Sequence, residues 1–206
     1  MRTFFMLTLL SIASLCAGCA SHSLTQNQCV AGDWQTVGHR DGQSGLSSTS
    51  LLTHQDACGE FGVIPDRTQY LAGWNQGVLS YCRADNGFAL GEQGSSYNDV
   101  CPTGLRGEFL GSYDQGRELY VARRDVRQLE STLSRNHARK VKIDARVLEL
   151  TAAQVEPTLT PTKRVELFTQ TKNLLEEKKR IEHDLPELEY QLDQAIARLE
   201  RLEYGS

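Results

Sequence analysis

The sequence predicts a mainly α-helical protein in which a small disulfide-stapled helical module is followed by a long antiparallel helical hairpin, a coiled coil. Three observations support this prediction. Four cysteines are spread over residues 29–117, a block rich in glycine and aromatic residues. One short sequence motif recurs three times in the same block, at residues 34–42, 69–77 and 108–116. Over residues 118–206, apolar residues follow the 3-and-4 spacing of helices that pack on one another.

The first eighteen residues have the character of a secretory signal. Arg2 gives a positive start, and the apolar run over residues 4–15 is shorter than the about 20 residues that span a bilayer. The signal ends in L-C-A-G-C at residues 15–19, which resembles the lipobox of bacterial lipoproteins, with Cys16 in place of the usual leucine. We expect cleavage before Cys19 and acylation of that residue, palmitate included. Ordinary cleavage nearby, without a lipid, is the alternative.

The residues that follow Cys19 predict where the protein resides. Ala20 stands there rather than an aspartate, which resembles the pattern of outer-membrane sorting. Several acyl chains form a durable anchor, whereas a single chain binds a membrane only marginally. The expected location is the inner leaflet of the outer membrane, facing the periplasm. Residues 19–28 are polar and aperiodic, and we expect them to be a linker next to the lipid.

The first part of the module is expected to hold three consecutive antiparallel helices, over residues 33–45, 50–61 and 67–82. Asp33 and Asp66 stand where the N-caps of the first and third helix belong. Gly38, Gly42 and Gly45 share one face of the first helix. Because each interior glycine costs a helix about 1 kcal/mol against alanine, this face indicates close approach of a neighbouring helix. A plain loop is the alternative.

If Cys19 carries a lipid, four cysteines remain in an oxidising compartment, and an even number there indicates two disulfides. Four cysteines allow three connectivities. In the three-helix arrangement, Cys29 and Cys58 lie near the same end of the first helix pair. Cys82 and Cys101 flank a loop, whereas a bond from Cys58 to Cys82 would have to span about 24 Å along a helix. The favoured pairing is therefore Cys29–Cys58 with Cys82–Cys101.

Residues 118–206 predict two heptad arms joined by a proline-containing turn near residue 158. Residues 123–146 carry eight basic and three acidic side chains, while residues 182–203 carry two and seven. Folding about the turn places these blocks of opposite charge largely side by side, where they set the register. Pro186 predicts a kink in the second arm. The polar seam positions should form one weak layer; they are Asn136, Lys140, Thr171 and Lys178.

No motif typical of a nucleophile, metal or phosphate site stands in its required context. His54 and Cys58 have a chelating spacing, but no CxxC accompanies them and thiols pair in an oxidising compartment. The acid–base residues that would converge near the first two helices are Asp33, His39, Asp41 and His54. They leave a hydrolase as a weaker alternative. We expect no enzymatic activity, cofactor or metal. Residues 19–117 hold ten acidic and five basic residues, which disfavours a nucleic-acid partner.

A trail of motifs runs through the block of residues 29–117. It comprises Asp33-Trp34, Gly38, Asp41-Gly42, Gly45, Ala57-Cys58, Pro65-Asp66, Tyr70, Gly73, Gly77, Tyr81-Cys82, Asn86-Gly87, Gly91, Gly94, Tyr97, Cys101-Pro102, Phe109, Tyr113 and Gly116. This trail resembles a family of proteobacterial envelope lipoproteins catalogued as a domain of unknown function, over about 90 residues. The resemblance implies an envelope location and this architecture. It brings no catalytic residues.

The function expected from these observations is a structural or interaction role. The lipid would fix one end to the membrane, and the hairpin would present a long surface to an envelope protein or to itself. The alternative is a module that binds peptidoglycan or another glycan. In that case the glycine-rich stretch 83–100, expected to be an irregular loop, would grip sugars through the candidate binding residues Trp74, Phe88 and Tyr97.

Overall fold

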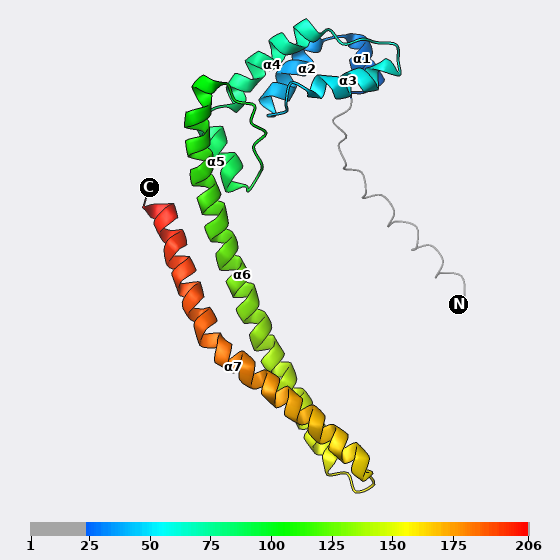
Figure 1. Cartoon of the computed structure of the whole chain (residues 1–206), viewed down its shortest axis with the longest axis vertical. Helices are drawn as coiled ribbons and strands as arrows, with labels where there is room; N and C mark the ends of the chain where they lie inside the picture. The colour runs from blue at the N-terminus through cyan, green and yellow to red at the C-terminus, as the bar shows by residue number, and fades with distance from the viewer. Residues whose placement is uncertain (1–23, 206) are drawn as a thin grey trace, which may run out of the picture. The chain divides into compact units, whose positions relative to one another are not determined.

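The computed structural model describes residues 24–205, and the regular structure within that range is helical (Figure 1). Its helices are α1 Gln26–Ala31, α2 Trp34–Gln43, α3 Ser50–Gly59, α4 Arg67–Tyr81, α5 Ala84–Glu92, α6 Thr103–Gln154 and α7 Pro161–Tyr204. The predicted fold class is confirmed. The predicted signal sequence, and Cys19 with it, lies outside the described residues.

The chain divides into two compact units, the first ending at Val78 and the second beginning at Leu79. The last turn of α4 therefore belongs to the second unit. The boundary expected between the module and the hairpin, at residues 117 and 118, falls inside α6, which is one continuous helix. Within residues 24–205, no helix combines the length and apolar character that crossing a membrane requires.

The helix starts in the first unit follow N-cap chemistry. An oxygen of the Asp33 carboxylate accepts a hydrogen bond from the backbone N–H of Thr36 at 3.1 Å. Asp66 accepts from the backbone N–H groups of Thr68 and Gln69, at 2.8 and 3.0 Å. Such caps satisfy N–H groups that have no partner inside the helix. The starts predicted for α2 and α4 are confirmed.

The linker predicted over residues 19–28 is wrong for its last part. Leu24 is buried, and α1 begins at Gln26 after a capping box formed by Thr25 and Gln28. A helix of six residues is too short to show apolar periodicity, so the pattern of the sequence misses it. Cys29 is fully buried on α1, and it holds this short helix in the packed unit.

α2 and α4 pack backbone against backbone. A Cβ atom at Gly38 or Gly42 would overlap a carbonyl group of α4, and one at Gly73 or Gly77 would overlap a carbonyl group of α2. The contacts advance in the same direction on both helices, so the two helices run parallel. The close approach predicted from the glycine face is confirmed for these positions. Gly45 instead follows the end of α2, in a turn with φ of 71°.

α5 and α6 repeat this arrangement in the second unit. A Cβ at Gly87 or Gly91 would meet the backbone of α6, and one at Gly116 would meet the backbone of α5. Ser112, four residues before Gly116, holds the position that Gly73 has in the first pair. The irregular loop predicted over residues 83–100 is therefore wrong for 84–92. Gly87 and Gly91 serve close packing between helices, whereas Gly94 lies in a turn with φ of 75°, as predicted.

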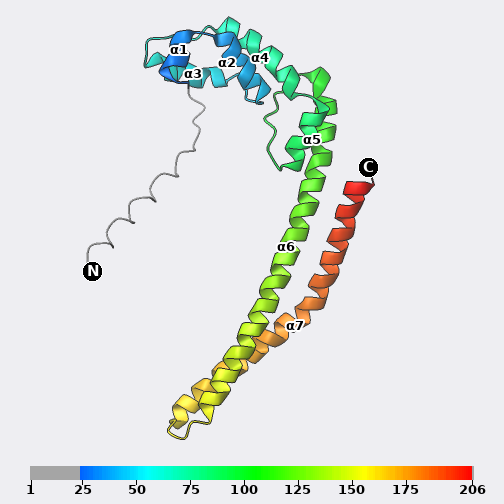
Figure 2. The same ribbon diagram turned by 180° about the vertical axis from the view of Figure 1, so that it is seen from behind.

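α6 and α7 run antiparallel and side by side (Figures 1 and 2). Ion pairs between the described residues of the two helices include Arg139–Glu177 at 2.6 Å, Lys140–Glu182 at 3.2 Å, Lys178–Asp144 at 2.6 Å and Arg123–Glu203 at 2.9 Å. The predicted hairpin and its pairing of opposite charges are confirmed. α7 bends in both views and continues as one helix through Pro186, so that residue does not break the second arm.

The predicted polar layer in the hairpin seam is confirmed only for the lysines. Lys140 and Lys178 lie 3.2 and 3.9 Å from the same carboxylate oxygen of Glu182. Thr171 lies elsewhere, because the hairpin register places it opposite Gln154, whose side-chain nitrogen donates to its hydroxyl at 3.1 Å. Asn136 is half-buried on α6. The seam therefore has a charged layer in its middle and a neutral polar contact near the turn.

Candidate functional site

Two disulfides hold the short helices in place. Cys29 on α1 bonds to Cys58 on α3, and Cys82 bonds to Cys101 just before α6. The Cα atoms are 5.5 Å apart in both pairs, and all four cysteines are buried. The structure pairs the cysteines as the helix order predicts. These four sulfur atoms are therefore structural, and none is present as a thiolate that could bind a metal ion.

A buried carboxylate joins three helices of the first unit. Asp41 on α2 accepts a hydrogen bond from the hydroxyl of Tyr70 on α4 at 2.9 Å. The same oxygen lies 2.7 Å from Nε2 of His54 on α3. A carboxylate oxygen of this kind accepts, so the histidine nitrogen donates. Nδ1 of His54 is buried and has no hydrogen-bond partner among the described residues. We call these three residues the polar clamp.

The environment of the polar clamp indicates a structural role. Tyr70 and His54 are at most 2% exposed, and Asp41 is 4% exposed. Burial raises the pKa of the Tyr70 phenol, and its hydrogen bond to Asp41 raises it further, so the phenol stays neutral and donates. A buried carboxylate with two donors is satisfied, and it fixes the relative rotation of the three helices.

The polar clamp contains two of the four residues from which an acid–base cluster was expected. Asp41 and His54 meet, whereas Asp33 caps α2 at the surface. The sequence does not reveal Tyr70 as the third member, because it lies 29 positions from Asp41 and no local spacing links them. Its only signal is its place on the glycine face of α4, which predicts packing and not hydrogen bonding.

The three candidate binding residues have different environments. Trp74 is half-buried, and its indole N–H donates to the carbonyl of Leu46 at 2.8 Å. The Tyr97 hydroxyl accepts from the backbone N–H of Cys101 at 2.8 Å, and its ring packs on Phe109. The fold thus uses the polar atoms of both rings. Phe88, in contrast, is 37% exposed on α5.

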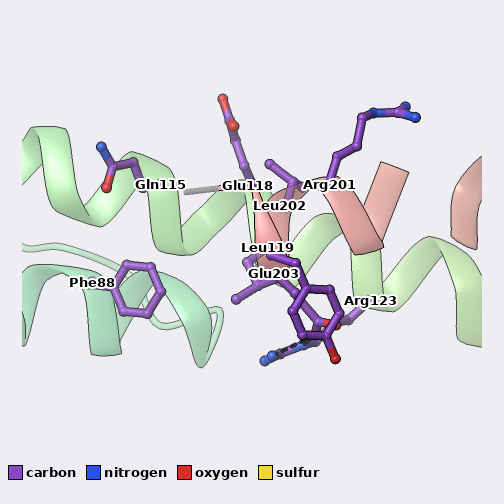
Figure 3. Close-up of a pocket in the computed structure, with 10 residues that line it drawn as sticks. Phe88, Gln115, Glu118, Leu119, Arg123, Arg201, Leu202 and Glu203 are labelled. Atoms are coloured by element: carbon purple, nitrogen blue, oxygen red, sulfur yellow. Dashed lines mark hydrogen bonds and ion pairs between the residues drawn. The ribbon is translucent and has the colours of Figure 1, made fainter. Parts of the chain in front are cut away.

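Phe88 borders an open groove between α5, α6 and the end of α7 (Figure 3). The groove has a volume of about 500 Å³. Its lining combines aromatic, apolar and charged groups: Phe88, Gln115, Glu118, Leu119, Arg123, Arg201, Leu202, Glu203, Tyr204 and Gly205. The sequence does not predict this groove, because its walls come from three helices, and α7 follows the other two only after the long hairpin turn.

Arg123 of α6 forms ion pairs with the other two helices that line the groove. Its guanidinium group binds Glu92 of α5 at 2.7 Å and Glu203 of α7 at 2.9 Å. The hydrogen bonds to Glu92 and then Glu203 raise the pKa of this guanidinium, which is charged in any case. Arg123 is about one-third exposed, so solvent and salt weaken both ion pairs. It docks the end of α7 onto α5 and α6.

Among residues 24–205, no group of three or more His, Cys, Asp and Glu side chains is arranged to hold a metal ion. The fold and these sites define a disulfide-stapled helical protein with a long hairpin, an internal polar clamp and an open amphipathic groove. Residues 33–118 match the model of a family described as "Protein of unknown function (DUF2799)". This agrees with the resemblance of the motif trail to a domain of unknown function. No curated protein and no solved structure matches the chain.

The matched range has a clear structural meaning. It begins at Asp33, the N-cap of α2, and ends in the first third of α6. It therefore includes both glycine-packed helix pairs, the polar clamp and all of α5, and it contains none of α7. Similarity to the family covers the packed helices, and the outer part of the hairpin lies beyond it.

Proposed function

We propose that this protein is an outer-membrane lipoprotein of the bacterial envelope that acts, without enzymatic activity, as a structural or interaction module. The observation that supports this most directly is the hairpin. α6 has 52 residues and α7 has 44. At about 1.5 Å per residue these helices are about 78 and 66 Å long. A hairpin of this length offers far more surface than the groove.

The outer half of the hairpin exposes apolar side chains. Val141, Leu148, Val155, Val165, Phe168 and Leu175 are between 47 and 75% exposed. Single exposed apolar residues are common on soluble proteins, but a group of six on one end of a hairpin marks an interaction surface. The partners that suit this reading are another envelope protein or a second copy. The lipid would supply the contact with the membrane.

The disulfides support the proposed compartment. Two buried disulfides within one chain are typical of secreted and periplasmic proteins, because the cytosol keeps thiols reduced. Together with the predicted signal and lipobox, they support export and anchoring at Cys19.

Anchoring is tested by expressing the full chain in a proteobacterial host with radiolabelled palmitate and separating the membranes on a sucrose gradient. The wild-type chain should carry label and sediment with the outer membrane. Cys19→Ala should lose the label and the membrane association. Cys16→Leu, which introduces the usual lipobox residue, is the matched control and should behave like the wild type. An unlabelled wild-type chain in the soluble fraction would contradict the anchor.

A second candidate function, glycan binding, is favoured by the groove. The rings of Phe88 and Tyr204 line it together with the polar side chains of Gln115 and Glu118. Aromatic faces and hydrogen-bonding groups in one groove suit a sugar. Purified peptidoglycan sacculi should then retain the protein, and Phe88→Ala should release it. Tyr190→Ala, an exposed ring of α7 outside the groove, is the control. Equal retention of the Phe88→Ala variant would eliminate this candidate.

A further inference from the structure

α6 carries a second apolar stripe, separate from the seam that packs on α7. Its members follow the same 3-and-4 spacing over 138–155: Ala138, Val141, Ala145, Leu148, Ala152 and Val155. All six are exposed, and the three large side chains are 70, 72 and 75% exposed. The seam residues Ile143 and Leu150, in the same part of α6, are almost fully buried. We call these six positions the outer stripe.

The outer stripe lies on the back of α6. In the heptad that places Ile143 and Leu150 in the seam, its members occupy the b and f positions. At about 100° per residue, the centre of these positions is about 150° around the helix from the seam. α7 therefore leaves the outer stripe uncovered. Helix propensity explains exposed alanines, but valine is a poorer helix former, so Val141 has no local reason to stand on an exposed face of α6.

We propose that the outer stripe is the surface through which two copies of this chain dimerise, with their α6 helices antiparallel about a two-fold axis between residues 146 and 147. Size complementarity supports this arrangement. It places Ala138 opposite Val155, Val141 opposite Ala152, and Ala145 opposite Leu148 of the second copy. Every alanine then faces a larger side chain, which is how two helices interdigitate without voids.

Charge supports the same orientation. One edge of the outer stripe carries Arg135 and Lys142 toward its start and Glu149 and Glu156 toward its end. Antiparallel pairing about the two-fold axis brings the basic end of this edge in one copy beside its acidic end in the other. The other edge holds His137, Asp144 and Thr151. Asp144 already forms an ion pair with Lys178 of the same copy at 2.6 Å, so its negative charge is compensated. This edge therefore does not oppose dimerisation.

This inference deepens the proposed function by naming the partner of the hairpin. Pairing through the backs of two α6 helices leaves each α6–α7 seam intact and gives a four-helix arrangement. Dimerisation itself depends on α6 and not on the anchor. If the chains are anchored in one leaflet, the anchor raises their local concentration and so favours pairing. The two proposals can therefore fail separately.

The pairing is tested by disulfide crosslinking of the full chain in cells. Val141→Cys and Ala152→Cys, carried on two differently tagged copies, should form a mixed dimer on a non-reducing gel. Val141→Cys expressed alone should not pair with itself, since the two positions are about 16 Å apart along the axis in the antiparallel dimer. Thr169→Cys, exposed on α7, gives the background level. Self-pairing of Val141→Cys, or a mixed dimer at background level, would overturn the proposal.

Further variants separate pairing from folding. Leu148→Glu should abolish the mixed dimer, whereas Val165→Glu, similarly exposed on α7, should leave it unchanged. Lys142→Glu should lower the crosslinking yield, and adding Glu149→Lys in the same chain should restore it. Circular dichroism checks that each variant remains helical. If Leu148→Glu leaves the yield unchanged, the outer stripe is not the interface. If crosslinking fails in chains that still sediment with the outer membrane, the dimer is refuted and the anchor is not.

Discussion

The two compact units use the same device to pack a pair of helices and surround it differently. In each unit, small residues four positions apart let two parallel helices touch through their backbones. The sets are Gly38, Gly42, Gly73 and Gly77 in the first unit and Gly87, Gly91, Ser112 and Gly116 in the second. Each unit also contains one disulfide. The first unit adds a polar clamp at Asp41, and the second adds a cluster of rings around Phe109.

The difference between the two units shows what each interior depends on. The ring of Phe109 is fully buried, with the rings of Tyr97 and Tyr81 at 4.9 and 5.4 Å between centroids. The stabilisation from such ring contacts depends on the area that the rings bury and on how well their shapes fit. Burial raises the pKa of Tyr81 in this cluster. The polar clamp depends instead on a few directed hydrogen bonds. The second unit should be sensitive to lost volume, and the first to lost hydrogen-bond partners.

The largest effect is expected for Phe109→Ala. Removing the central ring of the second unit leaves a cavity among Tyr81, Tyr97 and Tyr113. The free energy of unfolding should fall by about 4 kcal/mol. Chemical denaturation followed by circular dichroism measures it. Phe168→Ala, exposed on α7, is the control and should change it by less than about 0.5 kcal/mol. A small loss for Phe109→Ala would mean that the rings are not the core of this unit.

The shared packing device is tested by Gly73→Ala and Gly91→Ala. Alanine is the better helix former by about 1 kcal/mol, yet here its Cβ would overlap a backbone carbonyl of the facing helix. Each variant should therefore lose about 3 kcal/mol of stability. At Gly59 and Gly107 a Cβ meets nothing within 4 Å, so alanine there should stabilise. If all four substitutions stabilise the protein, the helices do not touch through their backbones.

A smaller effect is expected for Asp41→Ala, which leaves the Tyr70 hydroxyl and His54 Nε2 buried without an acceptor. The cost should be about 2 kcal/mol, the typical penalty of an unsatisfied buried polar group. Denaturation of this variant is compared with that of Asp56→Ala, which is exposed on α3. Equal stability of the two variants would show that the polar clamp does not hold the helices together.

The smallest effect is expected for Tyr70→Phe, about 1 kcal/mol from one lost hydrogen bond. This variant also tests the pH dependence. The pKa of Tyr70 is raised above 10.0 by burial, so above pH 10 the unfolded chain releases a proton that the folded chain keeps. That part of the stability is complete below pH 10 and is lost as the pH rises beyond it. The difference in free energy of unfolding between wild type and Tyr70→Phe should therefore become smaller above pH 10. A difference that stays constant with pH would contradict the raised pKa of Tyr70.

Local patterns were enough to predict much of the fold. The caps at Asp33 and Asp66 mark helix starts through short-range hydrogen bonds, and the order of helices decides which cysteines can meet. The opposite charges of the two arms set the hairpin register. α5 was missed because Gly87 and Gly91 have the same composition as a turn, and only a facing helix shows that they serve packing.

The candidate sites were less predictable because they combine residues that are distant in the chain. Tyr70 joins Asp41 only after α2 and α4 have packed, and the groove beside Phe88 forms only when the end of α7 reaches α5. Trp74 was a candidate binding residue because exposed and buried indoles look alike in a sequence. The outer stripe is readable from its spacing, but its exposure has to be seen, since a third helix of the same chain could have covered it.

The central claim is that the hairpin is the interaction surface and the glycine-packed units are its support. In-cell photo-crosslinking of the full chain tests this most directly, with a photoreactive residue placed at Leu148 on the hairpin or at Leu52 on α3. Both positions are exposed, by 72 and 60%. The account predicts crosslinked species from Leu148, a second copy among them as mass spectrometry would identify it, and none from Leu52. Crosslinks from Leu52 with none from Leu148 would contradict it.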